Sequence, residues 1–496
     1  MPQTGYNLAH LLERTTARSP DSAAIATRES FTTWRELSGR AGAFAHAFET
    51  AGASPGDRVA LYLERGPDAA AALFGAYAAG VVPVVVNPRL RARQIEHILS
   101  NSRAHALVTT AEGLARQGES WTPSVRVVDA GAVPGEAPFR TRAVAPDALA
   151  QIVYTSGSTG QPKGVMFTNH ALLSGIDTVS GYLELRAQDR VASLLSFSGV
   201  YGLNQLLTAA AVGATVVVEA SPLAADIVAN LASAGVTVIA AVPPLWLQLL
   251  AVPAFQQPLP SLRILQSAGG HLPVEAVRQL RARQPGARLF IQYGMTETFR
   301  STYLDPAEVD AHPGSMGRPL PGAEIVLVRP DGTVCDVDET GEIVYAGPTI
   351  AAGYWDGPEA TARVFRPHPL RPDVAAVFSG DLARRDADDL LYYVSRRDQV
   401  INTLGFRVGP DEITDVLHAS GQIAEAAITT RPDPERGQRI IAVVVLKPDG
   451  SVAALRRFCR EALPSYMLPA RFEVMDAIPR LPGGKFDVAA LAQLHA

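Results

Sequence analysis

Short apolar runs rich in β-branched residues recur along the first 300 residues of the chain, with helix-like segments between them. The runs occupy 58–63, 106–109, 214–219, 237–242, 262–266 and 288–292. Nearly continuous apolar runs of this length are typical of strands covered on both faces. The segments 223–234 and 273–283 have the pattern of helices. This alternation predicts an α/β fold with largely parallel strands.

The longest apolar stretch, 69–86, contains Gly75, Gly80 and Pro83. It predicts a buried helix that turns into a buried strand, and it lacks the continuity of a membrane span. The first residues, Met-Pro-Gln-Thr, show no basic segment followed by an apolar one, so no signal peptide is predicted. We therefore expect a cytoplasmic protein.

The sequence changes character from about residue 313. Pro-Asp-Gly-Thr at 330–333 and glycines at 341, 347 and 353 predict a β-rich subdomain of antiparallel hairpins. The Pro-rich stretch 366–373 predicts a loop. A polar turn near 396–398 predicts a boundary between a large N-terminal domain, 1–397, and a small α+β C-terminal domain, 398–496.

Composition excludes several classes of protein. Among 496 residues there are 44 basic and 49 acidic ones, a net charge of −5, so nothing points to nucleic acid. Two cysteines make neither a disulfide framework nor a multi-cysteine zinc site. Of the 44 basic residues only three are lysines, and Lys163 and Lys485 both adjoin glycine. Because a compact ammonium and a guanidinium bind phosphate differently, these lysines indicate special positions.

The segment 154–164 carries the strongest chemical signal. It reads Tyr-Thr-Ser-Gly-Ser-Thr-Gly-Gln-Pro-Lys-Gly, with hydroxyls and glycines alternating before Lys163. Glycines let backbone amides approach a polyphosphate, while hydroxyls and the lysine add donors and charge. It is not a Walker A loop, because glycine follows Lys163 and the glycine spacing differs.

Three further segments fit a nucleotide site. Gln-Tyr-Gly-Met-Thr-Glu-Thr at 292–298 follows a predicted strand, where ligands of α/β sheets bind, and Glu297 could hold magnesium through oxygen. Ser-Gly-Asp at 379–381, with Arg396 nearby, suits the hydroxyls of a ribose. Leu-Pro-Gly-Gly-Lys at 481–485 presents a lysine on a glycine turn.

In this order and spacing the chain resembles the adenylate-forming superfamily of acyl-CoA synthetases, peptide-synthetase adenylation domains and luciferases. The resemblance extends from Asp-Arg-Val-Ala-Leu at 57–61 through Gly-Glu-Ile at 341–343 and Gly-Tyr at 353–354 to Lys485. In detail, 201–206 and 300–304 are most similar to stand-alone bacterial acyl-CoA ligases.

The resemblance implies two half-reactions. A carboxylic acid attacks the α-phosphate of ATP to give acyl-AMP and pyrophosphate, and a thiol then displaces AMP. It implies Mg²⁺ and CoA, or the phosphopantetheine of a carrier protein acting in trans, as further requirements. It also implies a mobile C-terminal domain that rotates between the half-reactions.

The resemblance also assigns roles to individual residues. The catalytic set is Lys485, Thr296 and Glu297, with Glu297 on the metal. The nucleotide-binding set is Thr155, Ser156, Gly157, Ser158, Thr159, Gly160, Lys163, Gly269, Gly270, Tyr293, Asp381, Tyr393 and Arg396. Asp398 corresponds to the hinge and Gly405 to the thiol tunnel.

The acid pocket aligns with Gly199, Val200, Ala241, Gln266, Ala268, Gln292, Arg300 and Ser301. No acidic residue stands at 197–200 to pair with a substrate ammonium, so we expect a non-amino organic acid. The glutamines and Arg300 suggest a second polar group on it. Equally, Arg300 could point away from the pocket into a surface ion pair.

Other functions stay open at this point. The acceptor could be a carrier protein instead of CoA, and the acyl group could then be aminoacyl. A P-loop-type phosphohydrolase is disfavoured by the glycine after Lys163. A non-catalytic nucleotide- or acyl-binding relative is disfavoured because Glu297, Asp381 and Lys485 are all present.

Overall fold

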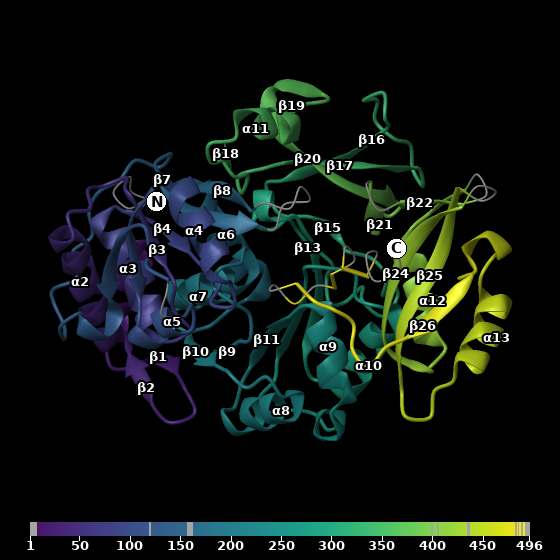
Figure 1. Cartoon of the computed structure of the whole chain (residues 1–496), viewed down its shortest axis with the longest axis horizontal. Coiled ribbons are helices and arrows are strands. Elements are labelled where there is room, and N and C mark those ends of the chain that lie inside the picture. The colour runs from purple at the N-terminus through teal and green to yellow at the C-terminus, as the bar shows by residue number, and fades with distance from the viewer. Residues whose placement is uncertain are drawn as a thin grey trace.

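The computed structural model describes residues 7–118, 121–155, 162–397, 400–403, 406–433, 437–481, 484, 486–487 and 490–491. Four β-sheets organise these residues, and helices cover the two largest sheets on both faces (Figure 1).

The largest sheet has nine strands in the order β15-β14-β13-β12-β11-β9-β10-β1-β2. Its central strands are parallel, and β2, β14 and β15 join its edges antiparallel. Parallel strands end at one edge, so the loops that follow them meet there. The strands are β1 (Ala23–Ala26), β2 (Phe31–Thr33), β9 (Arg190–Ser193), β10 (Thr215–Val218), β11 (Val238–Ala241), β12 (Ile264–Ser267), β13 (Arg288–Tyr293), β14 (Thr302–Tyr303) and β15 (Arg318–Pro319).

The second sheet has seven strands in the order β18-β8-β7-β4-β3-β5-β6. Its parallel part runs from β7 to β6, and the β7–β8 hairpin and β18 extend it antiparallel. The strands are β3 (Arg58–Leu61), β4 (Val82–Val85), β5 (Ala104–Thr109), β6 (Arg126–Asp129), β7 (Leu149–Thr155), β8 (Lys163–Thr168) and β18 (Gly353–Tyr354).

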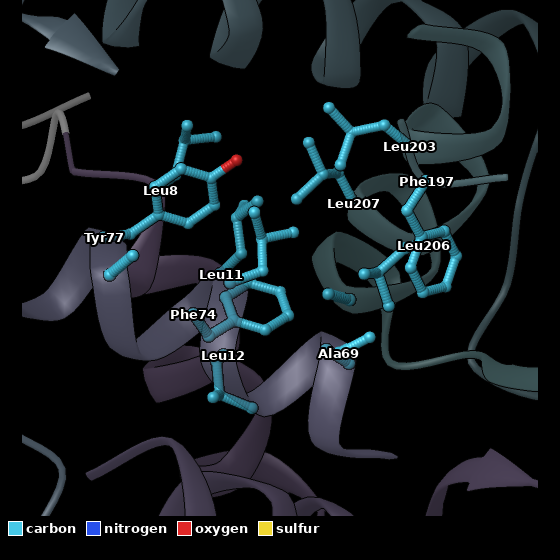
Figure 2. Packing of buried hydrophobic residues seen from close by; sticks show 14 of the residues in the cluster. Leu8, Leu11, Leu12, Ala69, Phe74, Tyr77, Phe197, Leu203, Leu206 and Leu207 are labelled. Carbon is cyan, nitrogen blue, oxygen red and sulfur yellow. The ribbon is translucent and has the colours of Figure 1, made fainter. Parts of the chain in front are cut away.

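One apolar cluster joins these two sheets through the helices between them. Figure 2 shows its centre, where Leu11, Phe74 and Leu206 come from three different helices. The contributing helices are α1 (Ala9–Arg18), α2 (Trp34–Thr50), α3 (Pro67–Ala79), α6 (Asn169–Leu183) and α7 (Val200–Val212). The outer faces are covered by α4 (Ala92–Ser102) and α5 (Ala111–Ala115) on one sheet and by α8 (Ala224–Ser233), α9 (Pro243–Ala251) and α10 (Val274–Arg283) on the other.

Helix α3 shows why the apolar stretch 69–86 folds as predicted. Every residue from Ala69 to Ala79 is buried, so the helix needs no polar face. Pro67 opens it and Gly80, with φ of 74°, ends it before β4 begins at Val82. The predicted helix followed by a buried strand is confirmed.

The third sheet is antiparallel, as the turn-rich sequence predicts. Its strands are β16 (Glu324–Val328), β17 (Thr340–Ala346), β19 (Phe365–His368), β20 (Arg371–Arg385) and β21 (Leu391–Arg396), with α11 (Pro358–Val364) beside them. The loop predicted for 366–373 is wrong, because β19 and the start of β20 pair there. Pro367 is tolerated because β19 is the edge strand, where a missing N–H breaks no ladder.

The residues from Ile401 onwards form the fourth sheet and the helices beside it (Figure 1). Among the described residues, this part has an apolar core of its own with 13 buried residues. Its strands are β22 (Ile401–Thr403), β23 (Phe406–Val408), β24 (Ile423–Asp433), β25 (Gly437–Leu446) and β26 (Arg471–Val474), packed on α12 (Pro410–Ala419) and α13 (Val452–Ala462). In the ranges that the structure describes, no helix is long and apolar enough to cross a membrane.

Gly317 ties the largest sheet to the third sheet. It bridges to Leu391 at the start of β21, with Leu391 N donating to Gly317 O at 3.0 Å. Its φ is +80°, and a Cβ added there would lie 1.8 Å from the carbonyl oxygen of Tyr303. Only glycine fits this junction.

Gly317→Ala should lower the free energy of unfolding by at least about 3 kcal/mol. The reason is that the backbone at Tyr303 must move to make room for the new Cβ, and the alanine must also adopt a strained positive φ. Gly322→Ala is the matched control, since Gly322 has φ of +78° but nothing within 4 Å of an added Cβ. It should cost only about 1–2 kcal/mol. Thermal unfolding of both variants measures the difference, and equal losses would contradict the steric argument.

Candidate active site

The segment predicted to bind phosphate joins β7 to β8, which pair as a hairpin. Thr155 and Lys163 are cross-strand partners at its end. The intervening site residues Ser156, Gly157, Ser158, Thr159 and Gly160 lie outside the described residues. The Lys163 ammonium lies 5.7 Å from the centroid of the Tyr354 ring. The hairpin thus directs the lysine towards the loop after β13, where the next group of predicted residues lies.

Thr296 and Glu297 form a short 3₁₀ turn, η3 (Thr296–Thr298), directly after β13. The Tyr354 hydroxyl donates to Glu297 Oε1 at 2.5 Å, and Ala351 N donates to Glu297 O at 2.8 Å. Burial, together with the Glu297 carboxylate, raises the pKa of Tyr354, so the phenol stays protonated and keeps donating. Because Tyr354 lies on β18, which pairs with β8, this contact fixes Glu297 relative to Lys163.

Asp381 and Arg396 face each other as register partners on β20 and β21. Asp381 is 6% exposed, and its Oδ2 accepts a hydrogen bond from the Tyr293 hydroxyl at 2.7 Å. Arg396 Nε lies 3.7 Å from Asp381 Oδ1. Burial and then the Asp381 charge hold the pKa of Tyr293 well above its ordinary value of 10. Tyr393 lies beside Tyr293, with ring centroids 6.4 Å apart.

Gly269 and Gly270 follow β12 and pack on the start of α9. A Cβ added at Gly269 would lie 3.3 Å from Val242, and one at Gly270 would lie 3.6 Å from Pro243. The φ of Gly269 is +85°, which favours glycine. On the same Val242, a Cβ added at Gly484 would lie 3.9 Å away. The end of the C-terminal part of the chain therefore reaches the glycine turn.

The residues predicted to line an acid pocket divide between the two faces of the largest sheet. Gln266 and Gln292 share the face covered by α6 and α7, and Gln292 Nε2 donates to Gln266 Oε1 at 3.4 Å. Arg300 lies over the ring of Tyr201, in the first turn of α7. Ala241, by contrast, packs in the apolar cluster of the opposite face. The remaining predicted positions, all but Gly199 buried, are Gly199, Val200, Ala268 and Ser301.

Magnesium needs little from the protein at such a site. Among the described residues no group of three His, Cys, Asp or Glu side chains could hold a metal by itself. Mg²⁺ usually takes one or two carboxylates and completes its shell with water and substrate phosphates. Glu297, fixed by Tyr354 and half-buried, fits that role.

Comparison with known proteins agrees with this arrangement. The sequence profile of the AMP-binding enzyme matches residues 12–355, and that of the AMP-binding enzyme C-terminal domain matches residues 412–485. The chain belongs to the AMP-binding enzyme family.

Individual proteins are similar to this AMP-binding enzyme over almost its whole length. Novobiocin biosynthesis protein H of Streptomyces niveus is 31% identical over 99% of this chain and 83% of its own length. A probable non-canonical nonribosomal peptide synthetase of Salinispora arenicola, CymA, is 31% identical over 98% of this chain, which spans only 6% of it.

Among solved structures, o-succinylbenzoate CoA synthetase from Bacillus subtilis is 27% identical, with a TM-score of 0.86 over 97% of both chains. That enzyme has been solved with its acyl-adenylate intermediate and, separately, with ATP and a magnesium ion. These comparisons confirm the predicted superfamily, the α/β fold and the class of enzyme, an AMP-forming ligase.

Three predicted functional residues of this AMP-binding enzyme, Lys485, Asp398 and Gly405, lie outside the described residues. Their neighbours are described. Arg480 Nη1 donates to Gly484 O at 2.9 Å, and Arg480 Nη2 donates to Glu425 Oε1 at 2.6 Å. The Arg480 guanidinium also lies 4.6 Å from the centroid of the Phe486 ring. Arg480 therefore contacts both residues that flank Lys485 in the sequence, Gly484 and Phe486.

Sequence analysis missed several residues that hold the site together. It assigned no role to Tyr354, although the motif at 353–354 contains it. Nor did it find Glu342, which accepts from Gly380 N at 2.9 Å and pairs with Arg397 at 3.0 Å, so that it holds the turn before Asp381. The Gly-Glu-Ile motif contains Glu342, but only the third sheet brings it to 380.

The C-terminal sheet docks on the N-terminal part through His271 and Asp415. His271 Nε2 lies 2.9 Å from both carboxylate oxygens of Asp415, and Asp415 Oδ1 also accepts from Val274 N at 3.3 Å. Burial lowers the pKa of His271, but the hydrogen bond and charge of Asp415 and the charge of Asp411 outweigh it, so the pKa is raised above 6.5. Sequence analysis assigned no role to His271.

Tyr354→Phe should slow acyl-AMP formation roughly 10- to 100-fold, because Glu297 loses a hydrogen bond to a charged group. The magnesium concentration required for half-maximal rate should rise with it. Tyr392→Phe is the control, because this variant also removes a tyrosine hydroxyl but does not affect Glu297. The Tyr392 hydroxyl lies 3.0 Å from His312 Nδ1. An unchanged magnesium requirement in Tyr354→Phe would contradict the positioning role.

Asp415→Asn should lower the pKa of His271, since burial then acts against the charged imidazole with less opposition. Because the pKa of His271 is raised, the His271–Asp415 pair adds its full contribution to the free energy of unfolding below pH 6.5. This contribution falls as the pH rises through the pKa of His271 in the folded protein. NMR titration of the histidines in the full chain measures this. The same His271 pKa in both proteins would show that the domains do not make this contact in solution.

Proposed function

We propose that this AMP-binding enzyme uses ATP and Mg²⁺ to join a non-amino carboxylic acid to the thiol of CoA through an acyl-AMP intermediate. The observation that carries the proposal is the pair of tyrosine–carboxylate contacts, Tyr354 on Glu297 and Tyr293 on Asp381, which both involve the end of β13 or the turn after it. In this proposal the Glu297 carboxylate binds the metal near Lys163, and the Asp381 carboxylate binds the ribose beside Arg396.

In the first half-reaction a carboxylate oxygen of the acid attacks the α-phosphorus of ATP. The bond from that phosphorus to the β-phosphate oxygen breaks, and pyrophosphate leaves. Lys163 and the 155–160 segment would hold the β- and γ-phosphates, and Thr296 would contact the α-phosphate. Magnesium, when bound at Glu297, neutralises charge on the phosphates. Such fixed charges stabilise a phosphoryl-transfer transition state more than its ground state.

Adenine and ribose would lie across the other group of residues. Tyr293 and the turn at Gly269 and Gly270 offer flat surfaces for the base. Asp381 would accept hydrogen bonds from the ribose hydroxyls, with Arg396 and Tyr393 beside it. Tyr293 keeps the Asp381 carboxylate oriented because its own hydroxyl stays protonated.

Lys485 would bridge the acid and the α-phosphate during adenylation. The closeness of Gly484 to Val242, where an added Cβ would lie 3.9 Å from the Val242 side chain beside the Gly269 turn, supports this placement for the first half-reaction. In the second half-reaction the thiol attacks the acyl carbon, the bond to AMP breaks, and AMP leaves. We propose 1–397 and 398–496 as the domains that rotate between these states, with Asp398 as hinge and Gly405 in the thiol tunnel.

The acid is proposed to lack an α-amino group. No acidic side chain occupies 197–200, and the buried cation Arg300 lies over Tyr201 in the adjoining turn of α7. A buried ammonium beside it would be repelled and unpaired. The likeness to a solved CoA synthetase supports CoA as the acceptor, while the likeness to a peptide synthetase makes a carrier protein the alternative.

Lys485→Ala should reduce acid-dependent exchange of labelled pyrophosphate into ATP by at least about 100-fold, yet leave thioester formation from supplied acyl-AMP within about threefold. The reason is that the lysine acts in only one half-reaction. Lys447→Ala is the control, because Lys447 is the exposed lysine of the same domain.

The exchange is measured across aliphatic, aromatic, hydroxylated, dicarboxylic and amino acids, and the thioester with CoA or a phosphopantetheinyl carrier protein. Equal loss of both half-reactions in Lys485→Ala would overturn the role of the lysine. Preference for a free amino acid would overturn the proposed substrate class, and transfer to the carrier alone would replace CoA as acceptor.

A further inference from the structure

Arg300 is a buried cation with no anionic partner among the described residues. It is 2% exposed, and its Nε has no hydrogen-bond partner there. Its guanidinium carbon lies 4.7 Å from the centroid of the Tyr201 ring. The surface ion pair that the sequence left open is therefore excluded. Because a guanidinium keeps its charge at any physiological pH, this charge is left to be neutralised by something else.

The tyrosine and glutamine side chains grouped with Arg300 are uncharged. Tyr201 OH donates to Gln266 O at 3.0 Å, and Tyr182 OH accepts from Gln292 Nε2 at 2.7 Å. Burial raises the pKa of both tyrosines by more than the charge of Arg300 lowers it, so both phenols remain protonated. None of these side chains can serve as the counter-ion.

A second buried donor lies in the same group. Gln266 is fully buried, and its Nε2 has no acceptor among the described residues. Gln266 is joined to Tyr201 through its backbone oxygen and to Gln292 through its side chain. Two unused N–H donors, one of them charged, call for an acceptor-rich anion such as a carboxylate. Gln292 Oε1 likewise has no hydrogen-bond partner among the described residues, so the group also offers a free acceptor.

We propose that the acid activated by this enzyme carries a second negatively charged group, which pairs with Arg300 and accepts from Gln266 at the inner end of the acid pocket. This inference rests on the proposed function, because it takes the space beside Gln266, Gln292 and Arg300 as the acid pocket. The second anion would neutralise Arg300, whereas a monocarboxylic acid would leave the charge buried and unpaired.

The test compares matched pairs of acids in pyrophosphate exchange with the full chain: butyrate with succinate, hexanoate with adipate, and benzoate with terephthalate. The wild type should prefer the dicarboxylic member of at least one pair by about 100-fold in kcat/KM. Arg300→Met should reduce that preference to near parity, and Arg300→Lys should retain part of it. Arg288→Met is the matched control, since Arg288 also lies over an aromatic ring, Phe290, but pairs with Glu184 at the surface.

Thermal unfolding with each acid, without ATP, gives a readout independent of activity. Saturating dicarboxylate should raise the Tm of the wild type by at least about 2 °C and leave that of Arg300→Met unchanged. Wild-type preference for the monocarboxylic member of every pair, or an unchanged preference in Arg300→Met, would overturn the inference while supporting the proposed function. A dicarboxylate-dependent rise in Tm without pyrophosphate exchange would support the inference and contradict the proposed function. The absence of both the Tm shift and the exchange would contradict the inference and the proposed function alike.

Discussion

The apolar layer shared by the two parallel sheets is the constraint on which the site depends. Helix α3 is buried from Ala69 to Ala79, so protein must cover this part of the helix on every side. Its close packing on α2 is permitted by Gly75, where an added Cβ would lie 2.6 Å from Ala41 O. Because both sheets bury their inner faces against the same helices, the end of the β7–β8 hairpin and the end of β13 are held in one relative position. The proposed function, in which Lys163 and Glu297 act on one ligand, relies on this fixed placement.

A tyrosine beside a carboxylate occurs at both ends of the nucleotide site. Tyr354 donates to Glu297 and Tyr293 donates to Asp381, and both phenols are buried enough to keep their protons. The hydrogen bond orients each carboxylate without neutralising it, so its charge stays available to a metal or its oxygens to a ribose. In each pair the tyrosine and the carboxylate come from different sheets or from segments far apart in the chain. The third sheet is thus part of the site as well as a neighbour of it.

The proposed acid pocket differs from the two tyrosine–carboxylate pairs, because its charged group, Arg300, has no anionic partner among the described residues. There the protein presents a cation and amide donors in a buried space and supplies no counter-charge among the described residues. A charge left unpaired by the fold is most simply explained by a ligand that pairs with it. The C-terminal sheet completes the arrangement from outside, because the His271–Asp415 contact and the Gly484–Val242 approach bring the end of the chain to the same loops.

The sequence alone determined the fold class, the alternation of several strands and helices in the first 300 residues, and the residue types in the motifs, because apolar periodicity and motifs of adjacent residues are local properties. The structure then placed Lys163, Glu297, Asp381 and Arg396 in the tyrosine-linked groups that local patterns could not show. Tyr354, Glu342 and Asp415 were missed because their roles exist only through partners far along the chain. The loop expected at 366–373 failed because sheet-edge pairing tolerates proline. Whether Arg300 faced solvent or the interior was decided only by tertiary packing, since burial depends on which elements cover a residue.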